Sequence, residues 1–239
     1  MTHADTNAEI WKSPEAVRNW LADVEKREHA RLPQWRLMGQ LLPFGADDAF
    51  TFVDLGAGTG AAARTLLDLY PRSRAVLADF SAVMMDEARA LLERFDGRYD
   101  YVEFDMTVGD WPDAIPAAVD AVVTSQCVHH LPDDRKQGLF TEIFDRLVPG
   151  GWYLNFDPVS SSDPIVDEAW VRANDRLDPD AAHKRLHRTP EEAARHANHV
   201  RYMLPLEPQL AFLRAAGFEA IDVYWKHLDY VIYGGRRPA

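Results

Sequence analysis

From residue 50 onward, apolar segments alternate with longer amphipathic ones, and this alternation is the strongest constraint on the fold. The segments "FTFVDL", "RAVLAD" and "VDAVVTS" read as buried strands, and a helical pattern follows each of them. Two more strand-like segments, "YDYVEFD" and "GWYLNFD", complete the series. Strands that alternate with helices build βαβ units with right-handed crossovers. The sequence therefore predicts an α/β fold around a mostly parallel sheet.

The two flanks of this core depart from the repeat. Residues 13–42 show a helical pattern that Pro33 is expected to break into two helices. Residues 158–205 read as helices joined by polar loops, which indicates an insertion over one end of the sheet. The chain then closes with a helix ending at Gly217 and two strands in "EAIDVYWKHLDYVIYGG". Their connection is too short for a parallel crossover, so we expect an antiparallel last strand.

The composition is that of an acidic, soluble protein. The formal net charge is -12, from 26 Lys and Arg against 38 Asp and Glu. Nucleic acid and anionic membranes are not expected partners, because phosphate binding needs clustered basic residues. Cys127 is the single cysteine, which excludes an intrachain disulfide and favours a reducing compartment. We see no leader pattern and no apolar run near ~20 residues, so a cytoplasmic protein is expected.

The glycine-rich segment "TFVDLGAGTGAA", residues 51–62, indicates a loop that approaches a ligand closely. Its spacing fits two cofactors. Gly56, Gly58 and Ala61 satisfy the dinucleotide fingerprint in its Gly/Ala form. Gly56, Gly58 and Gly60, preceded by Asp54, suggest a different ligand. The glycines alone leave both alternatives open.

Acidic residues at the strand ends separate the alternatives. Asp79 lies ~20 residues beyond the loop, where a carboxylate can accept both ribose hydroxyls of NAD or of S-adenosylmethionine. Asp54 is more selective, because its charge would repel a pyrophosphate and favour a cationic amino group or sulfonium. Asp105 can accept a hydrogen bond from an adenine amino group. Together these residues favour a positively charged nucleoside without phosphate.

Several segments carry this pattern in a fixed order along the chain. They are "VDLGAGTG" (53–60), "LADFSAVMMDEAR" (77–89), "VEFDM" (102–106), "VDAVVTSQCVHHLPDD" (119–134), "IFDRLVPGGWYLNFD" (143–157) and "LRAAGFEAIDVYWKHLDYVIYGGRRP" near the C-terminus.

In this order and spacing the chain resembles the class I S-adenosylmethionine-dependent methyltransferases of the small-molecule type. The resemblance implies a Rossmann-like, seven-stranded, mostly parallel sheet with an antiparallel last strand and helices on both faces. It also implies one domain over residues 1–239. We divide it into an N-terminal helical cap (1–49), a cofactor-binding core (50–157), a helical substrate lid (158–205) and a final helix with an antiparallel strand pair (206–239).

The resemblance further implies which residues hold S-adenosyl-L-methionine and its product S-adenosyl-L-homocysteine. The glycine loop would approach the methionine part, Asp79 would bind the ribose, and Asp105 with Met106 would hold the adenine. Phe80 and Met84 offer apolar cover, while Ser125 and Gln126 would flank the methionyl end. The expected cofactor-binding residues are Asp54, Gly56, Ala57, Gly58, Gly60, Asp79, Phe80, Met84, Asp105, Met106, Ser125 and Gln126.

Methyl transfer is an in-line displacement that needs the nucleophile ~3–3.5 Å from the methyl carbon. The acceptor must also lose a proton, and histidine is the usual base near neutral pH. His129 and His130 follow the fourth strand and Asp157 ends the fifth, where related small-molecule enzymes, including some sugar O-methyltransferases, place candidates for a base and its orienting carboxylate. We expect His129 and His130 as candidate bases and Asp157 as the orienter. The alternative, a histidine that only packs in the core, stays open.

The insertion carries histidines and basic residues. His183 and His187 are spaced i, i+4, and His196 and His199 are spaced i, i+3, as metal ligands on a helix can be. No cysteine or HExxH pattern accompanies them, so we expect no metal. The basic residues of this segment could face an anionic substrate or only solvent; they are Lys184, Arg185, Arg188, Arg195 and Arg201. Trp11, Trp20 and Trp35 could cover the other side of the pocket or pack in the core.

The expected acceptor is a small molecule. The segment after the fourth strand reads "TSQCVHH" and lacks the Pro-Pro-aromatic sequence usual for methylation of nucleic-acid bases. Two other functions remain open. One is a non-catalytic S-adenosylmethionine-binding sensor or assembly protein. The other is an NAD-dependent oxidoreductase, which is favoured only by Gly56, Gly58, Ala61 and Asp79.

Overall fold

A computed structural model describes residues 11, 14–22 and 24–239, and its strands form one seven-stranded sheet. The strands are β1 (Thr51–Leu55), β2 (Arg74–Asp79), β3 (Tyr99–Glu103), β4 (Val119–Ser125), β5 (Leu147–Pro158), β6 (Glu219–His227) and β7 (Tyr230–Arg236). Their order is β3-β2-β1-β4-β5-β7-β6. β1 to β5 pair in parallel, and β7 is antiparallel to both β5 and β6. The predicted Rossmann-like fold with an antiparallel last strand is confirmed.

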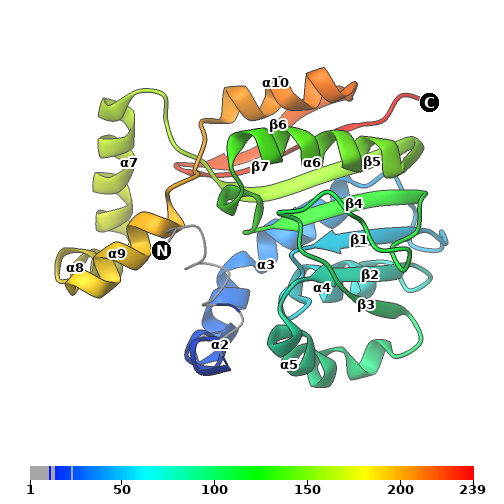
Figure 1. Ribbon diagram of the computed structural model, residues 1–239, viewed down its shortest axis with the longest axis horizontal. Helices are drawn as coiled ribbons and strands as arrows, with labels where there is room; N and C mark the ends of the chain where they lie inside the picture. Colours follow the sequence, from blue (N-terminus) through cyan, green and yellow to red (C-terminus); the bar gives the residue numbers. More distant parts are fainter. Residues whose placement is uncertain (1–10, 12–13, 23) are drawn as a thin grey trace.

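Helices cover both faces of this sheet (Figure 1). α6 and α10 pack on one face, while α3, α4 and α5 lie on the other. α7, α8 and α9 project from one end of the sheet. The helices are α2 (Pro14–Leu21), α3 (Val24–Leu41), α4 (Ala61–Leu69), α5 (Ala82–Leu92), α6 (Asp133–Arg146), α7 (Pro164–Leu177), α8 (Pro179–Leu186), α9 (Pro190–His199) and α10 (Leu206–Ala216), with the 3-10 turns η1 (Glu93–Phe95) and η2 (Val128–His130).

The predicted helix break at Pro33 is wrong, because Pro33 lies inside α3. The boundary between α2 and α3 falls ten residues earlier, between Leu21 and Val24. Trp35 and Met38 of α3 are buried, and Gly39 lies directly against the side chains of α4. Close packing of α3 on α4 therefore maintains the helix although the proline removes one backbone hydrogen bond. Residues 1–10, 12, 13 and 23 of the predicted cap lie outside the described residues.

Two strand boundaries also differ from the prediction. β3 ends at Glu103, so Asp105 stands in the following loop rather than at the strand end. β5 begins at Leu147, where Leu147 pairs with Val119 before the register shifts. Gly150, with φ of 84°, takes the left-handed conformation that this irregularity requires. The strand therefore runs through the Pro-Gly-Gly sequence instead of starting after it.

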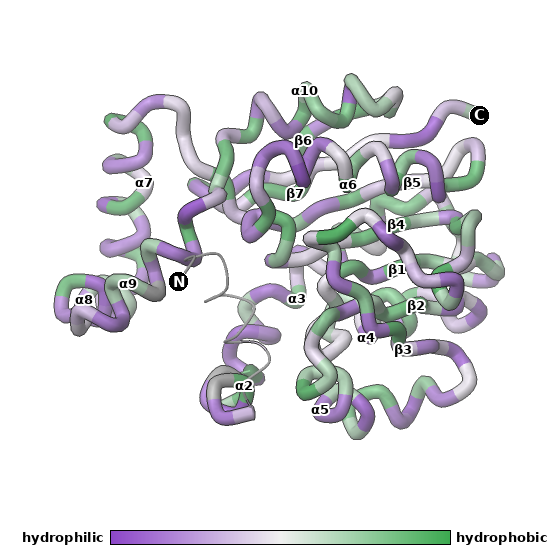
Figure 2. The backbone as a smooth tube through the Cα atoms, viewed as in Figure 1, coloured by the Kyte–Doolittle hydropathy of each residue, from purple (hydrophilic) through white to green (hydrophobic). Residues whose placement is uncertain are grey.

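Apolar side chains fill both faces of the sheet, as expected for a parallel sheet between two helical layers. The insertion over residues 158–205, predicted to be a substrate lid and called the lid below, differs, because α7 and α8 contain no buried residues. Figure 2 shows this contrast: hydrophobic residues run through the central strands, whereas α7 alternates between hydrophobic and hydrophilic turns. Among the described helices, none has both the length and the apolar character needed to cross a membrane.

The lid leaves and rejoins the core at a single place. Ser160, just after β5, forms a parallel bridge with Pro205. The Ser160 amide donates to the Leu204 carbonyl at 3.3 Å, and its hydroxyl donates to the Met203 carbonyl at 3.3 Å. The fully buried Lys136 of α6 donates to the Tyr202 carbonyl. The returning end of the lid is thus fixed to the core.

Candidate functional site

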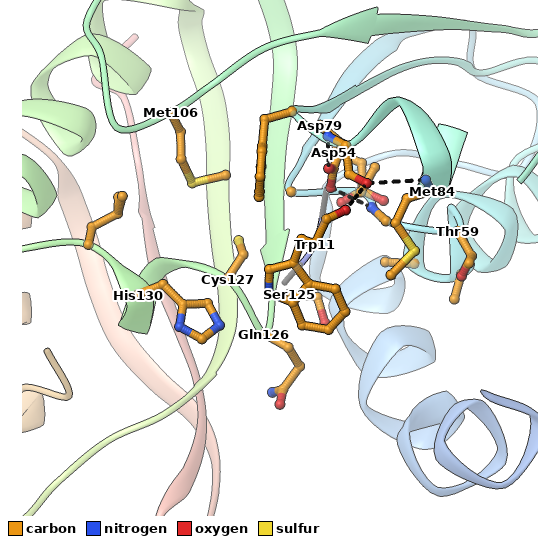
Figure 3. Close-up of a pocket in the computed structure, with 18 of the residues that line it drawn as sticks. Trp11, Asp54, Thr59, Asp79, Met84, Met106, Ser125, Gln126, Cys127 and His130 are labelled. Carbon is orange, nitrogen blue, oxygen red and sulfur yellow. Dashed lines mark hydrogen bonds between the residues drawn. The ribbon is translucent and has the colours of Figure 1, made fainter. Parts of the chain in front are cut away.

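A pocket opens at the carboxyl ends of the parallel strands, where the strand order reverses between β1 and β4. Open α/β sheets bind ligands at this switch point. Figure 3 shows Asp54 and Asp79 at one end of the pocket and His130 at the other. Residues from α3, the glycine loop, β2, β4 and the end of the lid line the pocket between them.

The glycine loop between β1 and α4 is held against β2. The amides of Gly56 and Ala57 both donate to the Ala78 carbonyl, at 2.8 and 3.2 Å. Gly56, Gly58 and Gly60 have positive φ angles of 69°, 54° and 75°. A Cβ at Gly58 would meet nothing within 4 Å, so this part of the loop faces open space. Backbone at Gly58 can therefore approach a ligand.

Gly60 has a different role from the other two glycines. It lies outside the pocket lining and forms the N-cap of α4. A Cβ at this position would lie 2.8 Å from a methyl group of Leu77 and 3.2 Å from one of Leu92. Gly60 thus lets α4 begin close to the core, which is a structural requirement rather than contact with a ligand.

Asp79 is the buried carboxylate at the end of β2. Its Oδ2 accepts a hydrogen bond from the Gly58 amide at 2.8 Å, and its Oδ1 accepts one from the Ser81 amide at 2.9 Å. Burial raises the pKa of Asp79, and the hydrogen bonds from Ser81 and Gly58 oppose that rise. One carboxylate thus connects the glycine loop to the start of α5 while facing the pocket.

Asp54 lies beside the loop on β1 and is 1% exposed. Its Oδ2 accepts a hydrogen bond from the Ala63 amide in the first turn of α4, at 3.0 Å. Burial raises the pKa of Asp54 to about 7, and the nearby charge of Asp79 adds to the increase. Asp54 is therefore balanced between its neutral and ionised forms near neutral pH.

The wall beyond β2 and β3 combines apolar and polar groups. Met84 and Met106 are buried and line the pocket together with Phe80. The Asp105 carboxylate accepts hydrogen bonds from the amide of Thr107 at 2.9 Å and from its hydroxyl at 2.6 Å. Asp105 is thus held at the pocket edge by its own loop, although it lies beyond the end of β3.

Ser125 and Gln126 follow β4 and line the middle of the pocket. The indole nitrogen of Trp35 donates to the Ser125 hydroxyl at 2.8 Å, which links α3 to the end of β4. Gln126 has a positive φ of 59°, an uncommon conformation for a residue other than glycine. Such strain is typical of residues at functional sites.

The predicted His-Asp group is assembled at the far end of the pocket. His129 Nδ1 lies 2.7 Å from Asp157 Oδ1, and the His129 amide donates to Asp157 Oδ2 at 2.7 Å. Both side chains are buried, at 3% and 1% exposure for His129 and Asp157. His130 lines the pocket, whereas His129 and Asp157 lie behind it. The structure therefore brings the three predicted residues together but exposes only His130 to the cavity.

Known proteins share parts of this sequence and this fold. Residues 52–151 match the family described as a methyltransferase domain. This segment, which runs from β1 into β5, is thus similar to a methyltransferase domain. The chain is 34% identical over 105 residues to trans-aconitate 2-methyltransferase of Azoarcus sp. (strain BH72), a match that covers 44% of this chain and 38% of the relative. It is 28% identical over 131 residues to acetylserotonin O-methyltransferase of Bos taurus, covering 54% and 36% of the two chains.

The structural similarity extends further than the sequence similarity. Human N-acetylserotonin methyltransferase, solved in complex with S-adenosylmethionine, superposes with a TM-score of 0.67 at 16% identity. The alignment covers 100% of this chain and 61% of the human chain. The chain spans less than two-fifths of the length of the curated relatives it matches. What this chain shares with the human structure is therefore the fold.

The pocket fits S-adenosylmethionine, the cofactor with which the human neighbour was solved. Two carboxylates are bonded to the glycine loop: Asp79 accepts from the Gly58 amide, and Glu28, which also pairs with Arg64 at 2.7 Å, accepts from the Thr59 hydroxyl at 3.3 Å. These charges disfavour a pyrophosphate and favour a sulfonium nucleoside. The open space at Gly58 admits a ligand against the backbone. The pocket thus fits this nucleoside better than a dinucleotide.

Most of the predicted cofactor residues line this pocket. The residues that do so are Asp54, Gly56, Ala57, Gly58, Asp79, Phe80, Met84, Asp105, Met106, Ser125 and Gln126. Trp11 and Trp35 also line it, as does Arg201 of the lid, while the Trp20 side chain lies outside the described part of the chain.

Sequence patterns did not reveal several other lining residues. Arg27, Glu28 and Arg31 come from α3, and Asn198 and Tyr202 come from the end of the lid. None of them belongs to a recognisable motif, because they become neighbours of the glycine loop only through tertiary packing. The remaining lining residues are Thr59, Ala61, Ala62, Ser81, Thr107, Cys127 and Leu131.

Proposed function

We propose that this protein transfers the methyl group of S-adenosylmethionine to a small-molecule acceptor. The observation that carries the proposal is the pair of buried carboxylates at the carboxyl ends of β1 and β2, of which Asp79 accepts from the glycine loop and Asp54 from the first turn of α4. When bound, S-adenosylmethionine supplies a methyl group already activated by positive sulfur. The protein must bind the cofactor and the acceptor, align the acceptor, and remove the proton of the acceptor.

The pocket residues divide between the parts of the cofactor. Asp79 would accept the ribose hydroxyls, and Asp54 would face the cationic amino group. Asp105 would accept from the adenine amino group, with Met106 beside it. Phe80 and Met84 would cover the ribose and adenine, Gly56, Ala57 and Gly58 would let the backbone approach the methionine part, and Ser125 and Gln126 would flank its end.

Cofactor affinity should rise with pH if Asp54 faces the amino group. Because the pKa of Asp54 is raised to about 7, most of the protein holds this carboxyl protonated below that pH. A cationic group requires the ionised form, so binding at lower pH must also expel a proton. The dissociation constant of S-adenosylhomocysteine should therefore fall from about pH 6 to about pH 8 and then level off.

Titration calorimetry in two buffers of different ionisation enthalpy measures both the affinity and the released proton. Asp54→Asn keeps an oxygen that can accept from the Ala63 amide but cannot ionise. The variant should bind more weakly and show a flatter pH profile with no proton release. An unchanged pH profile in Asp54→Asn would place the titrating group elsewhere.

The proton acceptor is proposed to be His129, oriented by Asp157. The 2.7 Å contact with a carboxylate keeps the proton on His129 Nδ1, so Nε2 presents its lone pair. His130 stands between His129 and the cavity, with the two ring centroids 3.9 Å apart. Burial, with the neighbouring His129 and His199, lowers the pKa of His130 to about 2. Because only His130 of these two histidines faces the cavity, the proton of the acceptor would reach His129 Nε2 by way of the His130 ring.

The acceptor side favours a small molecule that carries negative charge. Arg27, Arg31 and Arg201 line the pocket, and burial lowers the pKa of Arg31. Among the described residues, the ion pairs of the protein do not include Arg31, which instead hydrogen bonds to Tyr230. A buried guanidinium is stabilised by a partner carboxylate. The two curated relatives are both named for small-molecule acceptors, one of them trans-aconitate.

Ligand-dependent melting tests the proposed cofactor. S-adenosylhomocysteine at ~100 times its dissociation constant should stabilise the protein by ~2.7 kcal/mol, while NAD at the same concentration should not. Stabilisation by NAD alone would contradict the proposal and favour an NAD-dependent oxidoreductase. A screen of acceptors with labelled methyl donor, pairing each carboxylic acid with its amide, then tests catalysis. Binding without any turnover would favour the non-catalytic sensor.

A further inference from the structure

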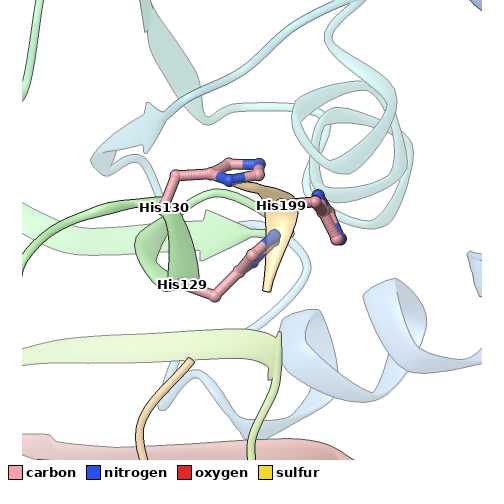
Figure 4. A group of neighbouring side chains, drawn as sticks. All are labelled: His129, His130 and His199. Atoms are coloured by element: carbon pink, nitrogen blue, oxygen red, sulfur yellow. The ribbon is translucent and has the colours of Figure 1, made fainter. Parts of the chain in front are cut away.

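Three histidines form a compact cluster beside the acceptor end of the pocket (Figure 4). His129 and His130 come from η2, and His199 is the last residue of α9 in the lid. One ring nitrogen from each lies within 4.8 Å of the other two. The ring centroids are 3.9 Å apart for His129 and His130, and 4.8 and 4.9 Å from each of these to His199. Core and lid thus place three potential ligands around one small space.

The innermost nitrogen of the cluster, His129 Nε2, is buried without a hydrogen-bond partner in the described structure. Figure 4 shows this nitrogen directed toward the other two rings. A buried polar atom without a partner is costly and is rare in native proteins. The opposite ring nitrogen is fixed on Asp157, the arrangement that orients a metal-binding histidine and raises its basicity. Nε2 is therefore held ready for an electron-pair acceptor.

The other two rings belong to His130, which is partly buried, and to His199, which is exposed. Neutral imidazole is the form that binds a metal ion. The charged groups that act on these rings are Arg31 and Asp157, which act on His199, and Lys136, which acts on His130. The Asp157 carboxylate opposes these two cations and contacts His129 directly at 2.7 Å.

We propose that His129, His130 and His199 together bind one divalent transition-metal ion of the Zn²⁺ type. Imidazole nitrogen is a preferred ligand of Zn²⁺, Ni²⁺ and Cu²⁺. Bonds of ~2.0–2.1 Å in tetrahedral geometry require ligand nitrogens ~3.3 Å apart. The spacing of up to 4.8 Å must therefore close by ~1.5 Å, which rotation of the exposed His199 side chain can supply. His130 lines the pocket, so the fourth position would face the cavity.

A metal ion bound at this site would inhibit the proposed methyl transfer, and its binding does not require that transfer. The metal ion and the acceptor proton would use the same lone pair on His129 Nε2, so the metal-loaded protein should lose turnover. If the metal instead raises turnover, the assignment of His129 as the base fails while the metal site stands. Binding of the ion is measured independently of any acceptor, so the two proposals fail separately.

The test is titration of the full-length protein with Co²⁺, followed by its absorption bands, and with Zn²⁺ in competition with a chromophoric chelator. We expect one tight equivalent in the wild type. His199→Ala should weaken it at least tenfold, since a ligand is lost. His196→Ala is the matched control, because His196 is exposed on the same helix with its ring centroid 6.4 Å from that of His199. That variant should bind as tightly as the wild type.

Melting temperature gives a second readout. The metal would connect α9 to η2, so one equivalent of Zn²⁺ should raise the melting temperature of the wild type and of His196→Ala, but not that of His199→Ala. His199 lies on the exposed lid, so its loss should leave the metal-free protein folded. The proposal is overturned by absence of a tight equivalent, by equal affinity in His199→Ala, or by equal loss in both variants.

Discussion

Asp79→Ala should reduce the affinity for S-adenosylhomocysteine by at least ~100-fold. Hydrogen bonds to a charged group are each worth ~1.5–3 kcal/mol, and the variant loses those that Asp79 would make to the ribose. It also loses the contacts that hold the Gly58 and Ser81 amides at 2.8 and 2.9 Å. Calorimetric titration measures the effect, and the melting curve without ligand shows whether the loop change has altered the fold.

Asp100→Ala is the matched control for this experiment. Asp100 lies on the neighbouring strand β3, its side chain is 63% exposed, and it pairs with Arg74 at the surface. Its removal should leave cofactor affinity unchanged. Asp79→Asn should fall between the two, since it keeps the shape but not the charge. If Asp79→Ala binds within tenfold of the wild type, the ribose is held elsewhere.

His129→Ala should lower methyl transfer by ~10²–10⁴-fold, the usual contribution of a positioned base. The acceptor used is the best one from the labelled-donor screen, and single-turnover rates separate chemistry from release. Affinity for S-adenosylhomocysteine should stay near that of the wild type, because His129 does not line the pocket and its neighbour His130 lies at the end distant from Asp79 (Figure 3). A loss of turnover with retained cofactor binding identifies a role in the chemical step.

Asp157→Asn tests the orienting role separately. The variant cannot hold the His129 Nδ1 proton by charge, so turnover should fall and its pH profile should shift, whereas His196→Ala should change neither. Since Asp157 also accepts from the His129 amide, the melting temperature must be compared first. Turnover within threefold of the wild type in His129→Ala would show that the acceptor needs no base from this residue.

The fold could be predicted because its signals are local. The strand β2 has the boundaries that its apolar pattern predicts, Arg74 to Asp79, since both faces of a central parallel strand must be apolar. Pro33 shows the limit of this reasoning. Its local preference for ending a helix is outweighed by the packing of Trp35 and Met38, which the sequence around Pro33 does not reveal.

Sequence patterns predict the residues of the site only where those residues lie at the ends of strands. Asp54 and Asp79 are placed by the ends of β1 and β2, so sheet topology brings them together. Arg31 and Tyr202 reach the same pocket from α3 and from the lid, and no periodicity relates them to the glycine loop. His199 pairs with His196 in the helical pattern, yet the structure places it against His129 and His130. Long-range packing of helices is the information that the sequence pattern lacks.

The bridge between Ser160 and Pro205 has a consequence for how this protein can diverge. Because the excursion formed by α7, α8 and α9 begins and ends at neighbouring backbone groups, its length and sequence can change without moving β5 or β7. The sheet then serves as a constant platform, and the excursion as an exchangeable module that contributes Asn198, Arg201 and Tyr202 to the pocket. Under the proposed function, acceptor preference can therefore change in one segment while the cofactor end stays unaltered.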